Sequence, residues 1–234
     1  MRPRYSVELL EREACGGDVV TFRFARPKEL SFCAGQWISL ELIVDGRPNA
    51  ETFTICSAPV DDFLEVTTRL SGSAYKNALN RLNAGDSAFV IGPGGRLALP
   101  TGASRLAFLV GGVGITPVRS MLRQACAEGV RFDDAVVFFA NRDVSCVPFQ
   151  RELEAMGAHG VRTVLCLEHP PTDWEGESGF ITAQTVRRHL PVDDARPYIV
   201  TGPPPMVAAM EGVLDDLAVP ESLRIIERFG ARAS

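Results

Sequence analysis

Short stretches in which apolar and polar residues alternate dominate the chain up to about residue 100. An alternation with a period of two is typical of a half-buried strand, and turn residues such as Ala84-Gly85-Asp86 separate the stretches. The stretches that predict strands are 5–10, 19–25, 37–44, 52–57, 63–70 and 87–91. Between the last two, residues 73–82 have apolar side chains at helical spacing. The pattern predicts a six-stranded antiparallel Greek-key barrel with one helix.

Beyond Pro100 the pattern changes to continuous apolar runs that alternate with helix-like segments. Apolar runs at 106–110, 135–140, 161–167, 198–201 and 223–227 predict strands, and 117–128, 148–156, 182–190 and 204–217 predict helices. Strands that are apolar throughout and alternate with helices are typical of a parallel sheet covered on both faces. We therefore expect a five-stranded parallel doubly wound sheet, and two domains, 1–100 and 101–234.

The composition narrows the class of protein. Hydrophobic residues make up 46% and charged residues 23% of the 234 residues, which is ordinary for a soluble globular protein. The formal net charge of −5 gives no reason to expect nucleic acid as a partner. No apolar run approaches the length of a bilayer span, and residues 1–5 are not followed by a signal-type apolar segment. We expect a cytoplasmic protein without a transmembrane segment, although a peripheral role against a membrane protein stays open.

The six cysteines lie far apart in the sequence, without a CxxC or other metal-type spacing, so no metal or iron–sulfur site is predicted. We interpret them as small buried hydrophobic residues. The three histidines have neither ligand spacing nor an obvious partner in a catalytic triad. We interpret them as structural or solvent-facing.

The strongest local signal for a ligand is the segment Leu109–Arg119, where a buried strand runs into a glycine turn. Thr116 is expected to cap the following helix, with Pro117 as its first residue. Gly112 and Gly114 let the backbone approach a ligand closely, and the start of a helix offers free N–H groups. This arrangement suits the pyrophosphate of a dinucleotide. A tight strand–helix turn without a ligand is the alternative, since proline replaces the third glycine of GxGxxG.

A second loop of this kind, Val200–Met206, also lies at the carboxyl end of a strand and precedes a helix. Two such loops on either side of the switch in strand order form the nucleotide crevice of a doubly wound sheet. Between them, the second strand ends at Asn141-Arg142-Asp143, where the ribose of the adenosine would lie. Arg142 favours the 2′-phosphate of NADPH, whereas Asp143 keeps NADH open.

In the first half, Ser71-Gly72-Ser73-Ala74-Tyr75 precedes the single predicted helix. The start of that helix suits a phosphate for the same physical reason. The alternative is that Ser73 only caps the helix.

The segments above, in this order, resemble the ferredoxin–NADP reductase superfamily of flavin reductases across nearly the entire chain. Phe32-x-Ala34-Gly35-Gln36 is similar to the F-x-x-G-Q strand opening of that family, and Phe53–Pro59 to its R-x-[YF]-[ST] flavin motif. Gly72–Tyr75 resembles the loop that holds the FAD pyrophosphate. The loops at 111–117 and 202–206 resemble the pair that holds the nicotinamide dinucleotide, and 227–230 resembles the E-x-F ending.

The resemblance implies site residues. Phe53 would stack on the isoalloxazine and Thr54 would hydrogen-bond near flavin N5. Thr54, Thr201 and Glu227 fall at catalytic positions, with Thr201 standing where the family often has cysteine. The other cofactor-binding positions are Ile55, Cys56, Thr68, Leu70, Gly72, Ser73, Ala74, Tyr75, Gly112, Val113, Gly114, Ile115, Thr116, Asn141, Arg142, Gly202, Pro203, Met206 and Phe229.

The resemblance also implies an activity. FAD, or alternatively FMN, would accept hydride from NADPH or NADH, and catalysis would consist of positioning the two rings. Electrons would then pass to a separate acceptor, either a small molecule or a redox protein, because the chain lacks the cysteines of an attached iron–sulfur domain. Two other readings stay open: an electron-transfer subunit docked on a partner oxidoreductase, and a nucleotide-binding regulatory module that has lost its flavin.

One residue departs from the family pattern. Glu51 stands where the family has the arginine that neutralises the flavin phosphate. Losing one charge-assisted hydrogen bond costs about 1.5–3 kcal/mol, or about one to two decades in affinity. Arg47, Arg69 and Lys76 are the candidate cations that would compensate; without one, flavin binds weakly or the site is lost.

Overall fold

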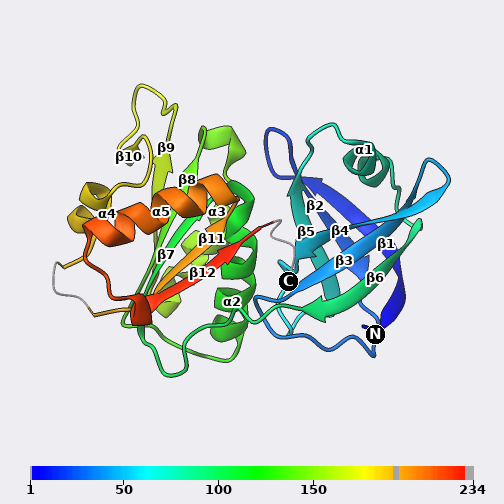
Figure 1. The fold of residues 1–234 in the computed structure, drawn as a ribbon, viewed down its shortest axis with the longest axis horizontal. Helices are drawn as coiled ribbons and strands as arrows, with labels where there is room; N and C mark the ends of the chain where they lie inside the picture. The colour runs from blue at the N-terminus through cyan, green and yellow to red at the C-terminus, as the bar shows by residue number, and fades with distance from the viewer. Residues whose placement is uncertain (1, 192–194, 230–234) are drawn as a thin grey trace. The chain divides into compact units, whose positions relative to one another are not determined.

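The computed structural model describes residues 2–191 and 195–229, and the chain forms two compact units (Figure 1). The first unit comprises residues 1–98 together with 116–127, and the second comprises 99–115 together with 128–234. Helix α2 (Ile115–Ala127) therefore packs almost entirely with the first unit, although the chain enters it from a strand of the second.

The first unit is built on an antiparallel sheet of six strands in the order β4-β3-β6-β1-β2-β5. A bridge between Ile55 and Val66 joins the end of β4 to β5, so that the sheet closes on itself. This confirms the predicted antiparallel barrel. The strands are β1 (Arg4–Ala14), β2 (Val19–Ala25), β3 (Trp37–Val44), β4 (Arg47–Thr54), β5 (Phe63–Arg69) and β6 (Ser87–Gly94), and the single helix is α1 (Ala74–Asn80).

Strand β4 differs from the prediction, which put a turn at 45–48 and a strand at 52–57. The turn is only two residues long, because Asp45 and Gly46 both have positive φ, of 51° and 75°. Two residues with positive φ form the tight hairpin that matches the twist of paired strands. The strand consequently begins at Arg47 and ends at Thr54, and Pro48 is accommodated because β4 stands at the end of the strand order.

The second unit contains a parallel sheet in the order β10-β9-β8-β7-β11-β12. The parallel doubly wound sheet is thus as predicted, but it has six strands rather than five. The additional strand, β10, consists of only Glu177 and Ser178 and pairs with the end of β9; two residues are too few to produce a recognisable period. The other strands are β7 (Arg105–Gly111), β8 (Asp134–Asn141), β9 (Val161–Leu167), β11 (Tyr198–Gly202) and β12 (Arg224–Arg228).

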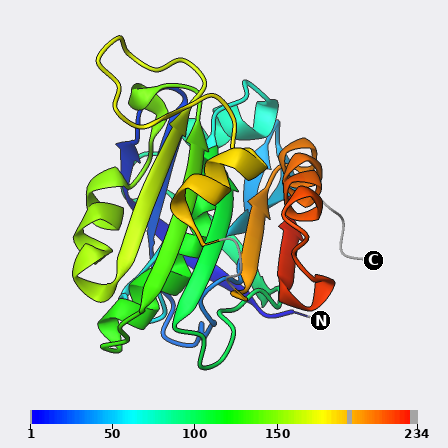
Figure 2. The ribbon, with the colours of Figure 1, turned by 90° about the vertical axis from the view of Figure 1, so that its left-hand side faces the viewer.

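Helices cover the parallel sheet, and Figure 2 shows α4 and α5 on one of its faces. Apolar side chains such as Leu109, Val136 and Phe138 pack there against Val186 of α4 and Val207 of α5. The helices of this unit are α3 (Gln150–Ala155), α4 (Ala183–His189) and α5 (Pro204–Asp216), with short 3₁₀ segments at Gly112–Gly114, Val144–Cys146, Met156–His159 and Glu221–Leu223.

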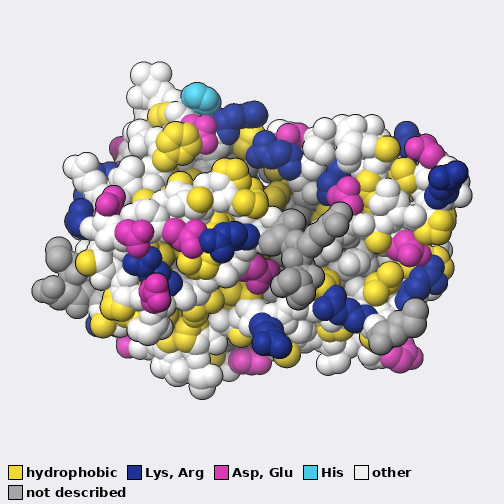
Figure 3. Space-filling view, viewed as in Figure 1, with side chains coloured by type: hydrophobic (Ala, Val, Ile, Leu, Met, Phe, Trp, Pro, Cys, Tyr) yellow, Lys and Arg dark blue, Asp and Glu magenta, His cyan; other side chains and the backbone are white. Residues whose placement is uncertain are grey.

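The structure allows the interpretations of charge, cysteines, membrane spans and metal sites to be compared with the positions of the side chains. On the face drawn in Figure 3, acidic and basic side chains are interspersed rather than gathered by sign. The cysteines are free, and Cys56, Cys146 and Cys166 are buried as interpreted. Cys15 and Cys126 are only half-buried and Cys33 is exposed, so the interpretation as buried hydrophobic residues was wrong for Cys33 and holds only in part for the other two. Within the described part of the chain, no helix is long and apolar enough to span a bilayer, and no group of three His, Cys, Asp or Glu could hold a metal ion.

Candidate functional site

The glycine loop after β7 enters α2 through a 3₁₀ turn. Gly112–Gly114 form that turn and α2 begins at Ile115. The prediction that Thr116 caps the helix and Pro117 is its first residue was therefore wrong, because the 3₁₀ turn continues directly into the helix and leaves both residues inside its first turn. Gly112 has φ of 50°, a conformation in which glycine is favoured.

The loops after β7 and β11 are held together by a short polar contact. The Thr201 hydroxyl donates a hydrogen bond of 2.6 Å to the carbonyl of Gly114. A Cβ atom on Gly114 would lie 2.4 Å from the carbonyl oxygen of Thr201, so only glycine fits there. Thr201 is fully buried. Its hydroxyl therefore fixes the two predicted nucleotide loops against each other.

Met206 packs beside the glycines of both loops. It lies in the first turn of α5, which begins at Pro204 after Pro203 as N-cap. A Cβ atom on Gly111 would lie 3.5 Å from Met206 Cγ, and one on Gly202 would lie 2.9 Å from its sulfur. Met206 thus lies close to a glycine of each predicted nucleotide loop.

Two of the three predicted catalytic residues are neighbours in the sheet. Thr201 on β11 is in register with Glu227 on β12. Glu227 is half-buried, and burial raises the pKa of its carboxyl group above the ordinary value. Phe229 follows and its backbone N–H donates to the carbonyl of Gly202 at 2.9 Å. Gly230, the last residue of the predicted ending, lies outside the described residues.

At the carboxyl end of β8, Asn141 is only 6% exposed, and neither polar atom of its side chain has a hydrogen-bond partner within residues 2–191 and 195–229. A buried amide without partners is costly, so this side chain fits a ligand or water that supplies them.

The next two residues pair with each other. Arg142, whose side chain is 52% exposed, donates to Asp143 at 3.2 Å. Asp143 also accepts hydrogen bonds from the hydroxyl and the backbone N–H of Ser145, and the Ser145 hydroxyl and Arg142 lower its pKa to about 2. The carboxylate is thus engaged locally, while the arginine reaches solvent.

In the barrel, the predicted flavin segment is anchored by its own backbone. Ile55 and Cys56 are fully buried; their N–H groups donate to the carbonyls of Gln36 and Glu65, both at 2.9 Å. Burial raises the pKa of the Cys56 thiol to about 12. These two residues hold the strand end in place. Thr54, the polar residue directly before them, is half-buried.

Phe53 points into the barrel core and is 6% exposed. The Tyr75 ring is stacked near it, with centroids 6.1 Å apart, and the Tyr75 hydroxyl donates to the carbonyl of Leu40 at 2.6 Å. The Lys76 ammonium lies 4.0 Å from the centroid of the Phe53 ring. The Phe53 ring is therefore already contacted by Tyr75 and Lys76, and its stacking on a flavin stays a prediction.

Glu51 forms an ion pair of 2.9 Å with Lys76, and Arg69 pairs with Asp18 at 3.3 Å. Ser73 accepts a hydrogen bond from the Lys76 backbone N–H, so it caps α1. Of the remaining predicted positions, Thr68 is buried, Leu70 is half-buried, and Gly72 and Ala74 are exposed.

The sequence reading missed the polar face of α2. Arg119 donates to the carbonyl of Cys56 at 2.8 Å, and Ser120 donates to the carbonyl of Ser57 at 2.6 Å. Arg123 binds both carboxylate oxygens of Asp61. The polar residues at 119, 120 and 123 were the available signal, but their partners lie some 60 residues away in the sequence.

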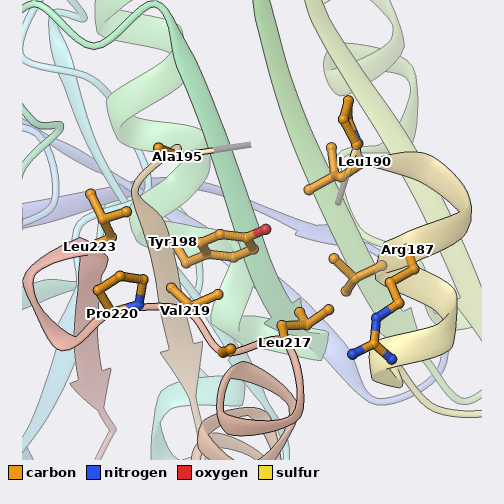
Figure 4. Close-up of a pocket in the computed structure, with 11 residues that line it drawn as sticks. Arg187, Leu190, Ala195, Tyr198, Leu217, Val219, Pro220 and Leu223 are labelled. Carbon is orange, nitrogen blue, oxygen red and sulfur yellow. The ribbon is translucent and has the colours of Figure 1, made fainter. Parts of the chain in front are cut away.

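A different feature, the cavity of Figure 4, lies at the opposite ends of the strands from these loops. It has a volume of about 240 Å³, and the residues that line it include Leu190, Tyr198, Leu217, Val219 and Leu223. It is smaller than a typical ligand pocket.

Comparison with known proteins shows the family of the chain. Residues 108–212 match the family described as Oxidoreductase NAD-binding domain. The chain is 30% identical over 228 residues to NADH-cytochrome b5 reductase 1 of Aspergillus terreus, covering 89% of this chain and 76% of that relative. It is 28% identical over 221 residues to ferredoxin–NADP reductase B of Sorangium cellulosum, covering 90% of each. The chain belongs to the ferredoxin–NADP reductase superfamily.

A solved member of the ferredoxin–NADP reductase superfamily supports the fold assignment. The ferredoxin NADP⁺ reductase from Neisseria gonorrhoeae, with bound FAD and NADP, matches with a TM-score of 0.83 at 21% identity, covering 96% of this chain and 98% of that one. As a member of the superfamily, the chain is an NAD(P)H-dependent flavin oxidoreductase with FAD as cofactor and NAD(P)H as electron donor. The hydroxyls of Thr54 and Ser73 are not fully buried, and a Cβ atom on Gly72 would meet no other atom within 4 Å, so these two segments leave room for a polar cofactor.

Proposed function

We propose that this enzyme transfers electrons from NAD(P)H, through FAD, to a separate redox protein. The observation that carries the proposal is the similarity to NADH-cytochrome b5 reductase 1, which extends over 89% of the chain and so includes both units. That relative and the ferredoxin–NADP reductase of Sorangium cellulosum are both named for protein electron carriers. A carrier protein is therefore a better-supported acceptor than a small molecule.

The two halves of the chain bind different ligands. The barrel, within residues 1–100, holds the flavin through the segments around Thr54, Thr68 and Gly72–Tyr75. The α/β part, within residues 101–234, holds the dinucleotide through the loops after β7 and β11. The Thr201–Gly114 hydrogen bond supports this second role, since it fixes both loops before a ligand arrives.

The chemistry requires little acid–base catalysis from the protein. When bound, FAD supplies a ring that accepts a hydride and releases electrons to the acceptor. The chain's own residues position the reactants: Thr54 lies at the end of the flavin strand, and Thr201 and Glu227 lie side by side where β11 and β12 end. We infer that Glu227 holds a proton near the donor, because it stands beside Thr201 in the sheet and burial raises its pKa.

Arg142 favours NADPH as the donor. Its side chain is 52% exposed at the end of β8, so a 2′-phosphate can reach the guanidinium although it pairs with Asp143, whose carboxylate is also held by Ser145. NADH remains the alternative, since relatives of both kinds match the chain. The free cysteines favour a reducing compartment, and we place the enzyme in the cytoplasm.

The test begins with the visible absorption spectrum of the purified protein after incubation with FAD. Anaerobic titration with NADPH and, separately, with NADH is expected to bleach the flavin. Cytochrome b5, a ferredoxin and ferricyanide are then added in parallel, and turnover with one of the two proteins at low concentration is the expected result. Turnover with ferricyanide alone would contradict a protein acceptor. Co-purification with another chain indicates an electron-transfer subunit, and a colourless protein that still binds NADPH indicates a regulatory module.

A further inference from the structure

Lys76 brings a positive charge to the centre of the predicted flavin site. Its ammonium group lies 2.9 Å from Glu51 Oε2, 2.9 Å from Thr68 Oγ1 and 4.0 Å from the centre of the Phe53 ring. These neighbours come from β4 and β5, and Lys76 itself comes from α1. Residues from three separate elements thus meet around one cation, at the site that the sequence pattern assigns to flavin.

The charges of this pair are unequally exposed. The Lys76 side chain is 11% exposed, whereas that of Glu51 is 36% exposed. Water screens the carboxylate more than the ammonium, so the ammonium acts more strongly on an anion placed beside it. An ammonium has three N–H donors, and Glu51 and Thr68 accept two of them. One donor remains for a further acceptor.

We propose that Lys76 binds the phosphate of the flavin cofactor and that Glu51 is the positioning residue that holds its ammonium group. The inference rests on the proposed function, because it takes FAD as the ligand of the barrel. It explains why the chain tolerates a carboxylate at the position of the family's arginine: the positive charge comes from α1 instead of β4. Glu51 then faces a lysine rather than a bare phosphate.

The other two cations that the sequence offered are less suited. Arg69 is paired with Asp18. Arg47 lies on the same strand as Glu51 but four residues earlier, which is about 13 Å along an extended strand. Lys76 is the one of the three that contacts Glu51.

The test measures flavin affinity rather than turnover, using protein stripped of flavin. Riboflavin carries no phosphate, FMN carries one and FAD carries two, and quenching of flavin fluorescence reports the dissociation constant of each. In Lys76→Met we expect affinity for FMN and FAD to fall about 10- to 100-fold, as for loss of one charge-assisted hydrogen bond. Affinity for riboflavin should change less than about twofold.

The chain contains a matched control, since Lys28 and Lys76 are its two lysines. Lys28 is exposed, and Lys28→Met should leave all three affinities unchanged. Equal binding of FAD by Lys76→Met and wild type would overturn the inference while leaving the reductase function intact. A wild-type protein that binds none of the three flavins would overturn both.

A second measurement on the wild type covers the case in which Lys76→Met fails to fold. FAD should protect Lys76 from amine acetylation, read by mass spectrometry with Lys28 as internal reference, and riboflavin should protect it much less. Equal acetylation with and without FAD contradicts the inference. Glu51→Gln should lower the pKa of Lys76, because burial lowers that pKa and Glu51 opposes the effect; an unchanged pKa would remove Glu51 from the positioning role.

Discussion

Arg119 of α2 and Glu65 of β5 form an ion pair of 2.7 Å, and both side chains are almost fully buried. Arg23 lies on the other side of the carboxylate, also at 2.7 Å. The same guanidinium nitrogen of Arg119 donates to the carbonyl of Cys56, just after the predicted flavin strand. The helix that follows the nucleotide loop is thereby fixed to the barrel by a buried charge.

Removing Arg119 should destabilise the protein strongly. In Arg119→Met the Glu65 carboxylate stays buried with Arg23 as its remaining partner, so we expect the free energy of unfolding to fall by about 3 kcal/mol. Urea unfolding measures this loss. Arg81→Met, at an exposed position of the same unit, should change it by less than about 0.5 kcal/mol. The double variant Arg119→Met/Glu65→Gln should lose less unfolding free energy than the sum of the losses in the two single variants. Strict additivity would mean that the pair is not coupled.

The ion pair of Asp61 with Arg123 should make stability depend on acid pH. Burial would raise the pKa of Asp61, but the hydrogen bonds from Arg123 and from the Ala58 N–H outweigh it, so the folded pKa lies below 3.8. Stability from this group is complete above the unfolded pKa and is lost as pH falls through the folded one. Asp61→Asn should therefore lower stability at neutral pH and flatten the loss below about pH 4. Asp62→Asn, the exposed neighbour, is the control; the same flattening in both variants would disprove the assignment.

Glu227 should have the opposite effect on stability. Burial raises its pKa in the folded protein, so the folded state binds the proton more tightly than the unfolded state. The stabilisation is therefore present at low pH and is lost as pH rises through the folded pKa. Glu227→Gln should be more stable than the wild type at neutral pH, and unfolding measured from about pH 4 to 8 checks this.

The same variant separates a proton-holding role from a structural one. If Glu227 holds a proton near the donor, Glu227→Gln should slow flavin reduction in stopped-flow measurements without weakening NAD(P)H binding. A variant that is more stable and reduces flavin at the wild-type rate at every pH would exclude the catalytic role.

Arg142 should set the preference between donors. If its exposed guanidinium binds a 2′-phosphate, Arg142→Ala should lower kcat/KM for NADPH by about 10- to 100-fold and leave that for NADH within about twofold. Arg151→Ala, another exposed arginine of the same unit, is the matched control. Equal losses with both donors would point to a general effect on the loop, since Arg142 also contacts Asp143.

Much of the fold could be predicted because its signals are local. The residues of β2, β3 and β9 were predicted to the exact residue, since each alternates or stays apolar over seven or eight positions and ends at turn residues. Strand β10 and the start of α2 could not be predicted, because a two-residue strand has no period and a 3₁₀ turn uses the same glycines as a loop.

The sequence by itself determined the class of each half and the position of the two glycine-rich loops, since periodicity and turns depend on neighbouring residues, and the order of its motifs indicated the family. Only the tertiary structure decided which residues are partners. Glu51 and Lys76 are 25 positions apart, and Arg119 and Glu65 are 54 apart. Each pair meets because the barrel closes and packs against a helix. Charged side chains on separate elements carry no local signal of their partner, because the contact depends on long-range packing rather than on spacing along the chain.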